Sequence, residues 1–126
     1  MSIENVQTNA APAAIGPYSQ GIKLNGLIFV SGQLPLDPES GSMPEGVEAQ
    51  TEQALKNLSA VLEAAGSGLD AVLKTTIFIK DMGEFPVINE IYAKYFSDNR
   101  PARACVEVAR LPKDALVEIE AIATAK

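Results

Sequence analysis

Ile22-Lys23-Leu24-Asn25-Gly26-Leu27-Ile28-Phe29-Val30 is the stretch of this sequence from which the fold can be read. Two apolar, β-branched runs flank Asn25-Gly26, a dipeptide that supplies the two positive φ angles of a type I′ turn. The stretch therefore predicts a two-residue β-hairpin. Such a turn sets the register, and the predicted opposite pairs are Leu24 with Leu27, Gln20 with Ser31, and Tyr18 with Gln33. Because side chains alternate along a strand, one face of the sheet is expected to carry Tyr18, Gln20, Ser31 and Gln33.

Beyond the hairpin, helical and extended patterns alternate along the chain. Apolar residues recur every three or four positions over 47–65, which predicts an amphipathic helix. The run 72–80 is β-branched and apolar on both sides, as in a central strand. A second helical stripe covers 85–96, and the runs 102–109 and 116–123 alternate as two further strands.

The predicted order is thus β-β-α-β-α-β-β over one domain, residues 1–126. Two helices can cover only one face of a sheet of this size. The other face still carries apolar side chains, whichever parity points inward. Because an apolar sheet face must be buried, we expect a second copy of the chain to cover it.

Composition and charge exclude several functions. The chain has 126 residues, one cysteine (Cys105) and no histidine, so an internal disulfide and imidazole catalysis are impossible, and a zinc site is not expected. A net charge of −6 disfavours nucleic acid and anionic membranes as partners. No apolar run reaches the length of a membrane span, and the N-terminus lacks the pattern of a signal peptide, so a cytoplasmic location is expected.

The last two predicted strands, 102–109 and 116–123, carry the residues best suited to chemistry. If a tight turn joins them, Cys105 lies opposite Glu118 and Arg103 lies one step beyond. An arginine can grip a carboxylate through two parallel hydrogen bonds, and a neighbouring carboxylate can position or deprotonate water. The alternative interpretation is that Arg103 and Glu118 form a surface ion pair, which contributes little to folding stability.

Other candidate residues also admit two interpretations. Ser31 has no histidine or lysine base, so a hydrolase triad is excluded, while Gly32 beside it either lets a ligand approach the backbone or marks a bulge. Tyr18 either caps a pocket or fills a core. Cys105 is more typical of a small buried apolar residue than of a nucleophile, and Asn89 needs partners and could brace a loop.

Separated blocks of the sequence, taken together, resemble the Rid family, also called the YjgF family, and most closely its RidA subgroup. The blocks occur in order and at suitable spacings along nearly the whole chain. They are 13–20 (AAIGPYSQ), 30–33 (VSGQ), 85–92 (FPVINEIY), 101–106 (PARACV), and 111–112 (LP) followed by 118–120 (EIE).

The resemblance implies an α+β fold of the chorismate-mutase-like type. Each protomer would be a mixed β-sheet with two helices packed on one face, and three protomers would form a homotrimeric barrel with sites in the clefts between subunits. The implied activity is hydrolysis of 2-aminoacrylate-type enamines and their imine tautomers, 2-iminopropanoate and 2-iminobutanoate, to 2-oxo acids and ammonia. The family uses no cofactor and no metal.

The resemblance also implies roles for individual residues. Arg103 is similar to the family's carboxylate clamp, and Glu118 to the residue that orients the attacking water. Six further positions match the family's pocket: Tyr18 and Ser31 near the reacting atoms, and Gly32, Cys105, Asn89 and Phe85 as substrate contacts. The sequence departs from the family at Arg100, where an apolar or aromatic residue often stands, and at Ala104, where serine is common.

Two rival functions are compatible with the same residues. The cleft could bind 2-oxo acids without catalysis, or the trimer could act as a chaperone. A ribonuclease or translation inhibitor is disfavoured because Lys23, Lys74 and Lys80 are scattered and form no basic stripe.

Overall fold

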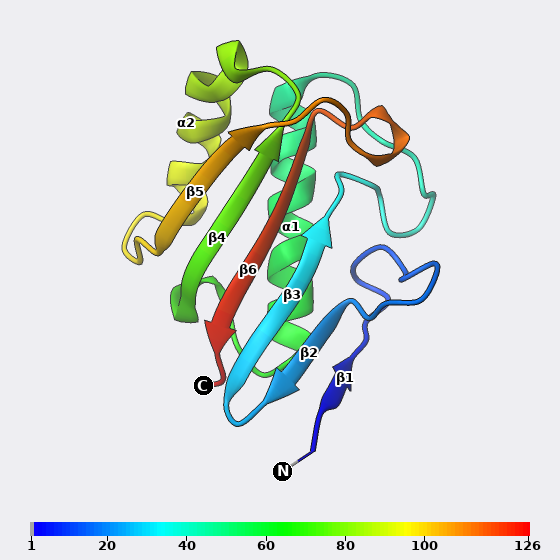
Figure 1. Ribbon diagram of the computed structural model, residues 1–126, viewed down its shortest axis with the longest axis vertical. Helices are drawn as coiled ribbons and strands as arrows, with labels where there is room; N and C mark the ends of the chain where they lie inside the picture. Colours follow the sequence, from blue (N-terminus) through cyan, green and yellow to red (C-terminus); the bar gives the residue numbers. More distant parts are fainter. Residues whose placement is uncertain (1) are drawn as a thin grey trace.

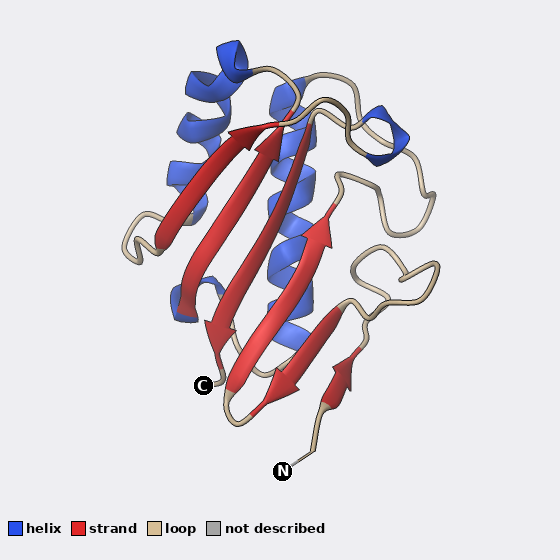
Figure 2. Ribbon diagram, in the orientation of Figure 1, coloured by secondary structure: helices blue, strands red, loops and turns tan. Residues whose placement is uncertain are grey.

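A six-stranded mixed sheet with both helices on one face forms the fold of the computed structural model, which describes residues 2–126 (Figures 1 and 2). The strands are β1 (Glu4–Val6), β2 (Gly21–Leu24), β3 (Leu27–Gln33), β4 (Val72–Ile79), β5 (Ala102–Glu107) and β6 (Val117–Thr124). The α-helices are α1 (Val47–Ala64) and α2 (Phe85–Tyr95). Short 3-10 turns are η1 (Leu69–Ala71), η2 (Met82–Glu84) and η3 (Pro112–Asp114). The predicted α+β class and element order are confirmed, and β1 is an additional strand.

The β2–β3 hairpin has the predicted turn and register. Asn25 and Gly26 have φ angles of 51° and 79°, and Leu24 pairs with Leu27. The register continues past β2, since the Ser31 amide donates to the Gln20 carbonyl at 3.0 Å. The hairpin is therefore determined locally, by the turn dipeptide and the flanking apolar runs.

A β-bulge in β3 overturns one part of that prediction. Val30 pairs with Ala121, but Gln33 pairs with Ile119, so β3 contains one residue more than β6 between these pairs. The extra residue turns Gln33 toward the buried face, where its side chain is 5% exposed. Gln33 and Ser31 therefore do not share a face of the sheet.

The strand order is β1-β2-β3-β6-β4-β5, and it overturns the predicted pairing of the last two strands. β5 pairs with β4 in parallel, because α2 is a crossover connection that returns the chain to the same end of the sheet. β6 pairs antiparallel with β4 and β3. β4 thus lies between β5 and β6, and the segment 108–116 passes over its end instead of forming a tight hairpin turn.

The core lies between the sheet and the two helices. α1 buries Leu55, Leu58 and Leu62 completely, as its helical spacing predicts, and the alternate residues of β6 from Val117 to Ala123 face it. In Figure 1, α1 lies behind β3 and β6 and α2 behind β4 and β5. Both helices therefore leave the opposite face of the sheet without cover.

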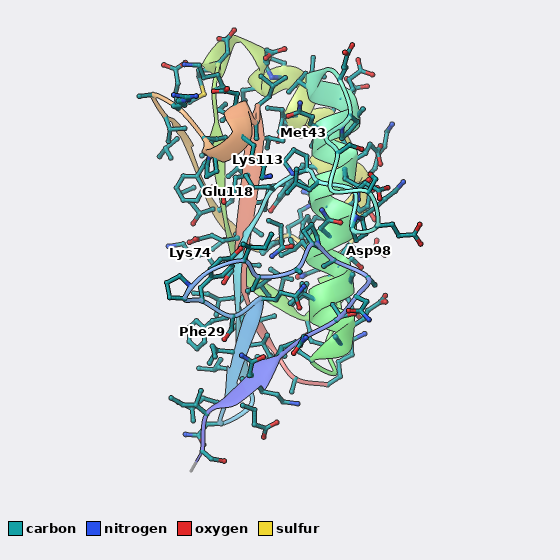
Figure 3. All side chains as sticks on the ribbon, turned by 90° about the vertical axis from the view of Figure 1, so that its right-hand side faces the viewer. Phe29, Met43, Lys74, Asp98, Lys113 and Glu118 are labelled. Atoms are coloured by element: carbon teal, nitrogen blue, oxygen red, sulfur yellow. The ribbon has the colours of Figure 1, made fainter. Side chains whose placement is uncertain are left out.

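That helix-free face carries apolar side chains. Phe29 is 44% and Val106 41% exposed. Ile22 and Ile122 pair with Phe29 in the register, and Leu27 lies two residues before it on β3. Figure 3 shows Phe29 and Lys74 on the side of the sheet away from the helices. The sequence-based expectation of an apolar uncovered face is met within this chain.

Candidate functional site

Six of the eight candidate residues line two pockets of the described chain, which we call the Glu118 pocket and the Arg103 pocket; Phe85 and Cys105 line neither. The Glu118 pocket has a volume of about 710 Å³ and lies where the bulge of β3 meets the start of β6. Its wall includes Tyr18, Gln20, Ser31, Gly32, Gln33, Lys113, Glu118 and Glu120. All four hairpin residues that sequence reasoning grouped therefore do line one pocket, although they do not share a sheet face.

Glu118 is the half-buried carboxylate of this pocket. Burial raises the pKa of its carboxyl group, and the neighbouring charge of Glu120 raises that pKa further. A carboxyl group whose pKa is raised toward neutrality is suited to accept a proton from water.

Gly32 makes room for the Glu118 carboxylate. A Cβ atom at residue 32 would stand 2.6 Å from Glu118 Oε2 and 2.8 Å from Cδ, closer than real Cβ contacts. The absence of a side chain therefore lets the carboxylate lie against the backbone of the bulge. The bulge expected at this glycine is confirmed, and the group that approaches its backbone is the Glu118 side chain; approach of a ligand stays a prediction.

Ser31 and Tyr18 also line the Glu118 pocket. The Ser31 hydroxyl donates to the Ser19 carbonyl at 2.6 Å, which leaves the oxygen as an acceptor toward the pocket. Tyr18 is 55% exposed, so it is not core filler, and its amide donates to the Gly16 carbonyl at 2.9 Å. The tight turn at Gly16, with a φ of 122°, places the ring at the pocket mouth.

Three buried amide side chains brace the loops that form these walls. Gln20 donates to the carbonyls of Ala11 and Pro12 in the N-terminal arm, and Asn57 of α1 donates to those of Leu34 and Leu36, both at 2.9 Å. Gln50 donates to Pro44 and accepts from the Leu116 amide, which precedes β6. The pocket is therefore built on loops, but each loop is tied to the core.

The η3 turn also lines the Glu118 pocket, and its backbone is strained. Lys113 and Asp114 both have a φ of 57°, a conformation that residues with a side chain seldom adopt. Arg110 pairs with Asp114 at 2.7 Å and closes this loop on itself. Strain of this kind is concentrated at functional positions, and here it places Lys113 on the pocket rim (Figure 3).

The Arg103 pocket lies at the β5 edge of the sheet, between β5 and α2. Its volume is about 650 Å³, and its wall consists of Asn89, Tyr92, Ala93, Phe96, Ser97, Arg100, Pro101 and Arg103. Arg103 Nη1 donates to Asn89 Oδ1 at 2.7 Å. The prediction that Asn89 needs a partner is thus met, and the partner is the guanidinium instead of a loop.

Two aromatic rings support the same guanidinium. Arg103 Cζ stands 4.9 Å from the centroid of Tyr92 and 5.4 Å from that of Phe85, both within the range of a cation–π interaction. Because the amide and the rings hold one edge and one face, the remaining N–H groups are oriented and free to meet an anion. Arg103 is therefore held in an orientation that suits an anion.

Tyr92 is a residue of this site that sequence reasoning placed only in the core stripe. Its hydroxyl is hydrogen-bonded to Thr75 of β4 at 2.7 Å, and burial raises the pKa of the Tyr92 hydroxyl. The signal was present in the sequence: Phe85, Asn89 and Tyr92 are spaced by four and three residues and so share one helix face.

Cys105 follows Arg103 on the same face of β5, is only partly exposed and packs against the core. Burial raises the pKa of its thiol, and the charge of Arg103 opposes that shift. The thiol is therefore protonated at neutral pH, which agrees with the interpretation of Cys105 as a small apolar residue.

Arg103 and Glu118 do not meet within one chain, contrary to the expected hairpin geometry. Arg103 faces α2, whereas Glu118 pairs in register with Phe78 on the helix-free face. β4 also separates their strands. The two candidate groups thus belong to different pockets of the same protomer. Among residues 2–126, no three metal-binding side chains cluster.

Comparison with known proteins identifies the family. The family described as Endoribonuclease L-PSP matches residues 8–125. A RutC family protein of Pyrococcus horikoshii is 52% identical over 121 residues, covering 95% of this chain and 96% of the relative. The 2-iminobutanoate/2-iminopropanoate deaminase of Salmonella typhimurium is 49% identical over 123 residues, with 95% and 96% covered.

The solved structure of the YjgF gene product of Escherichia coli has the same fold. It superimposes with a TM-score of 0.94 at 47% identity, covering 98% of this chain and 99% of that one. The chain therefore belongs to the L-PSP (YjgF) family, as its sequence blocks indicated. No helix among the described residues is long and apolar enough to cross a membrane.

Proposed function

We propose that this protein is a cofactor-independent imine deaminase that hydrolyses 2-iminopropanoate and 2-iminobutanoate to 2-oxo acids and ammonia. The observation that carries the proposal is the prearranged guanidinium of Arg103, held by Asn89, Tyr92 and Phe85 with its remaining donors free. A relative 49% identical over nearly the whole chain is named for this reaction. On this proposal residues 1–126 are one domain acting in the cytosol.

The proposal assigns the substrate carboxylate to Arg103. A charge-assisted hydrogen bond contributes about 1.5–3 kcal/mol, and a planar carboxylate fits the two parallel donors of a guanidinium. The contacts of the substrate are completed by Asn89, Phe85 and the backbone of Cys105 from one side, and by Gly32, Ser31 and Tyr18 from the other.

Glu118 activates the water in this mechanism. Its carboxylate takes a proton from the water as the water oxygen bonds to the carbon of the protonated imine, and the C=N bond becomes a single bond to an NH2 group. Glu118 then returns this proton to the nitrogen and accepts the proton of the new hydroxyl group, as the carbon–oxygen double bond forms, the C–N bond breaks and ammonia leaves. Because an imine is already electrophilic, orientation of the water and substrate suffices, without metal or imidazole.

The proposal requires a second protomer. Arg103 and Glu118 lie in different pockets of one chain, so a complete site needs the Arg103 pocket of one copy beside the Glu118 pocket of another. The uncovered apolar face of the sheet supplies the surface for association, and a homotrimer with inter-subunit sites is the arrangement we propose.

The test is ammonia and 2-oxobutanoate release from the enamine that threonine dehydratase generates. We expect Arg103→Ala to lower kcat/KM at least 100-fold, since the carboxylate loses its charged partner. Lys56→Ala, an exposed cation on α1 outside both pockets, is the matched control and should match the wild type. Full activity of Arg103→Ala would refute the proposal. Binding of 2-oxo acids without turnover by the wild type would favour a non-catalytic binding protein.

A further inference from the structure

The Arg103 pocket contains a second guanidinium that the proposed mechanism does not use. Arg100 and Arg103 line the same pocket of about 650 Å³, at the end of α2 and the start of β5. Arg100 makes no hydrogen bond or ion pair with any of the described residues 2–126, and Asp98, two positions earlier, does not line the pocket. The pocket therefore holds two cations with no carboxylate in its wall.

The two guanidiniums are prepared differently. Arg103 is stacked on Tyr92 and bonded to Asn89, so its direction is set. Arg100 is exposed and unrestrained, just before Pro101. Three residues of extended chain separate their backbones by about 10 Å, a span that two long side chains can adjust inward to meet the ends of a four- or five-carbon diacid.

Charge makes this pocket unusual within the chain. The whole protein carries a net charge of −6, which repels a dianion, so a doubly charged substrate needs a local site of opposite sign. Arg100 stands next to the Pro101-Ala102-Arg103 block, where it adds a positive charge beside the clamp. The polar groups of Ser97 and Asn89 lie in the same wall.

We propose that Arg100 is a specificity-determining residue that extends the substrate range to imines of dicarboxylic amino acids, such as 2-iminosuccinate. Arg103 binds the carboxylate next to the C=N bond, and Arg100 binds the carboxylate of the side chain. This inference rests on the proposed function, because the reaction is the same: water adds to the imine carbon, the C–N bond breaks, and a 2-oxo diacid and ammonia leave.

The experiment compares two imines in one assay. Amino-acid oxidases generate 2-iminopropanoate from alanine and 2-iminosuccinate from aspartate, and semicarbazide traps whatever imine the protein has not hydrolysed. The measured quantity is the ratio of kcat/KM for 2-iminosuccinate to that for 2-iminopropanoate. We expect Arg100→Met to lower this ratio about 10- to 100-fold, Arg100→Lys to restore part of it, and Lys56→Met to leave it unchanged. Circular dichroism checks that each variant is folded.

The outcomes separate this inference from the one on which it rests. Hydrolysis of 2-iminopropanoate with no activity on 2-iminosuccinate would overturn the role of Arg100 and leave the proposed function standing. An unchanged ratio in Arg100→Met would do the same. Failure to hydrolyse either imine would overturn the proposed function itself, and the substrate extension with it.

Discussion

At the scale of single residues, the candidate site depends on two charged side chains, Glu118 and Arg103, whose charge or orientation is set by a few neighbours. Gly32 leaves the space into which Glu118 fits, and Glu120 adds its charge to the effect of burial on the Glu118 carboxyl group. Asn89 and Tyr92 do the corresponding work for Arg103 by fixing one edge and one face of its guanidinium. Glutamate and arginine are common residue types, so what distinguishes these two candidate groups is the set of neighbours around them.

The raised pKa of Glu118 predicts a pH dependence of both activity and stability. The carboxylate must be ionised to take a proton, so kcat/KM should rise with pH through a pKa above the ordinary glutamate value. Glu118→Gln should lower kcat about 100-fold and remove that limb of the profile. Glu120→Gln should move the limb to lower pH, because it removes a charge that raises the pKa of Glu118. A limb that stays in place in Glu120→Gln would contradict this assignment.

The sign of the stability effect follows from the same shift. A carboxyl group whose pKa is raised by folding favours the folded state below its unfolded pKa, and this contribution is lost as pH rises through the folded pKa. Glu118→Gln should therefore raise the thermal midpoint at pH 7.5 and give no gain at pH 4. Calorimetry at both pH values measures the difference, and an equal change at the two pH values would contradict the prediction.

At the scale of elements, α1 and α2 serve the site as well as the core. α2 presents Phe85, Asn89 and Tyr92 to Arg103, and Thr75 of β4 holds the Tyr92 hydroxyl. The Asn57 amide of α1 donates hydrogen bonds to the loop after β3. The rigid elements therefore hold the loops of the candidate site in place, so the geometry of that site depends on how the helices pack.

Asn57→Leu tests this coupling. The side chain of Asn57 is 1% exposed, and leucine has a similar volume but would leave the Leu34 and Leu36 carbonyls without their donor. We expect the free energy of unfolding to fall by about 1–3 kcal/mol in urea denaturation. KM for the imine should also rise, because Leu34 and Leu36 line the Glu118 pocket.

The control for Asn57→Leu is Lys56→Leu, a neighbouring change on the exposed side of α1. It should leave stability within about 0.5 kcal/mol, the usual range for surface positions, and KM unchanged. A destabilised Asn57→Leu with an unchanged KM would show that the amide supports the fold but not the pocket.

At the scale of the whole molecule, the chain is a sheet covered on one side. Leu27, Phe29 and Val106 lie on the helix-free face with a third or more of their surface exposed. Arg103 lies on the edge strand β5, whereas Glu118 lies on β6, on the other side of β4. The association that we propose accounts for both features, because it would bury this face and bring the Arg103 pocket of one copy beside the Glu118 pocket of another.

Phe29→Glu tests the proposed association through the helix-free face. A carboxylate at the centre of an apolar interface is costly to bury, so we expect the assembly to dissociate to monomers in analytical ultracentrifugation and deaminase activity to fall at least tenfold. The helix content measured by circular dichroism should stay the same, since Phe29 does not contact α1 or α2. Met82→Glu, an exposed apolar residue in η2, is the control and should keep the assembly. An active monomeric Phe29→Glu variant would contradict the inter-subunit site.

Local sequence was sufficient for the elements of this fold. The Asn25-Gly26 turn, the 3.6-residue spacing of α1 and α2 and the alternation of the strands depend on neighbours a few residues away. The elements predicted from them are confirmed, except that the bulge in β3 breaks the predicted alternation at Gln33. The candidate residues were also recognised from the sequence blocks, although their catalytic roles stay a prediction.

Only the tertiary structure decided which strands are neighbours beyond the β2–β3 hairpin. The insertion of β6 between β3 and β4, the bulge that turns Gln33 inward and the separation of Arg103 from Glu118 all depend on pairing between distant segments. Strand pairing minimises the exposed apolar surface of the whole sheet and obeys the crossover made by α2, and neither quantity is present in any one stretch of the chain. For the same reason, the helical spacing of Tyr92 predicts only that it faces the core, whereas its contact with Arg103 is visible only in the folded chain.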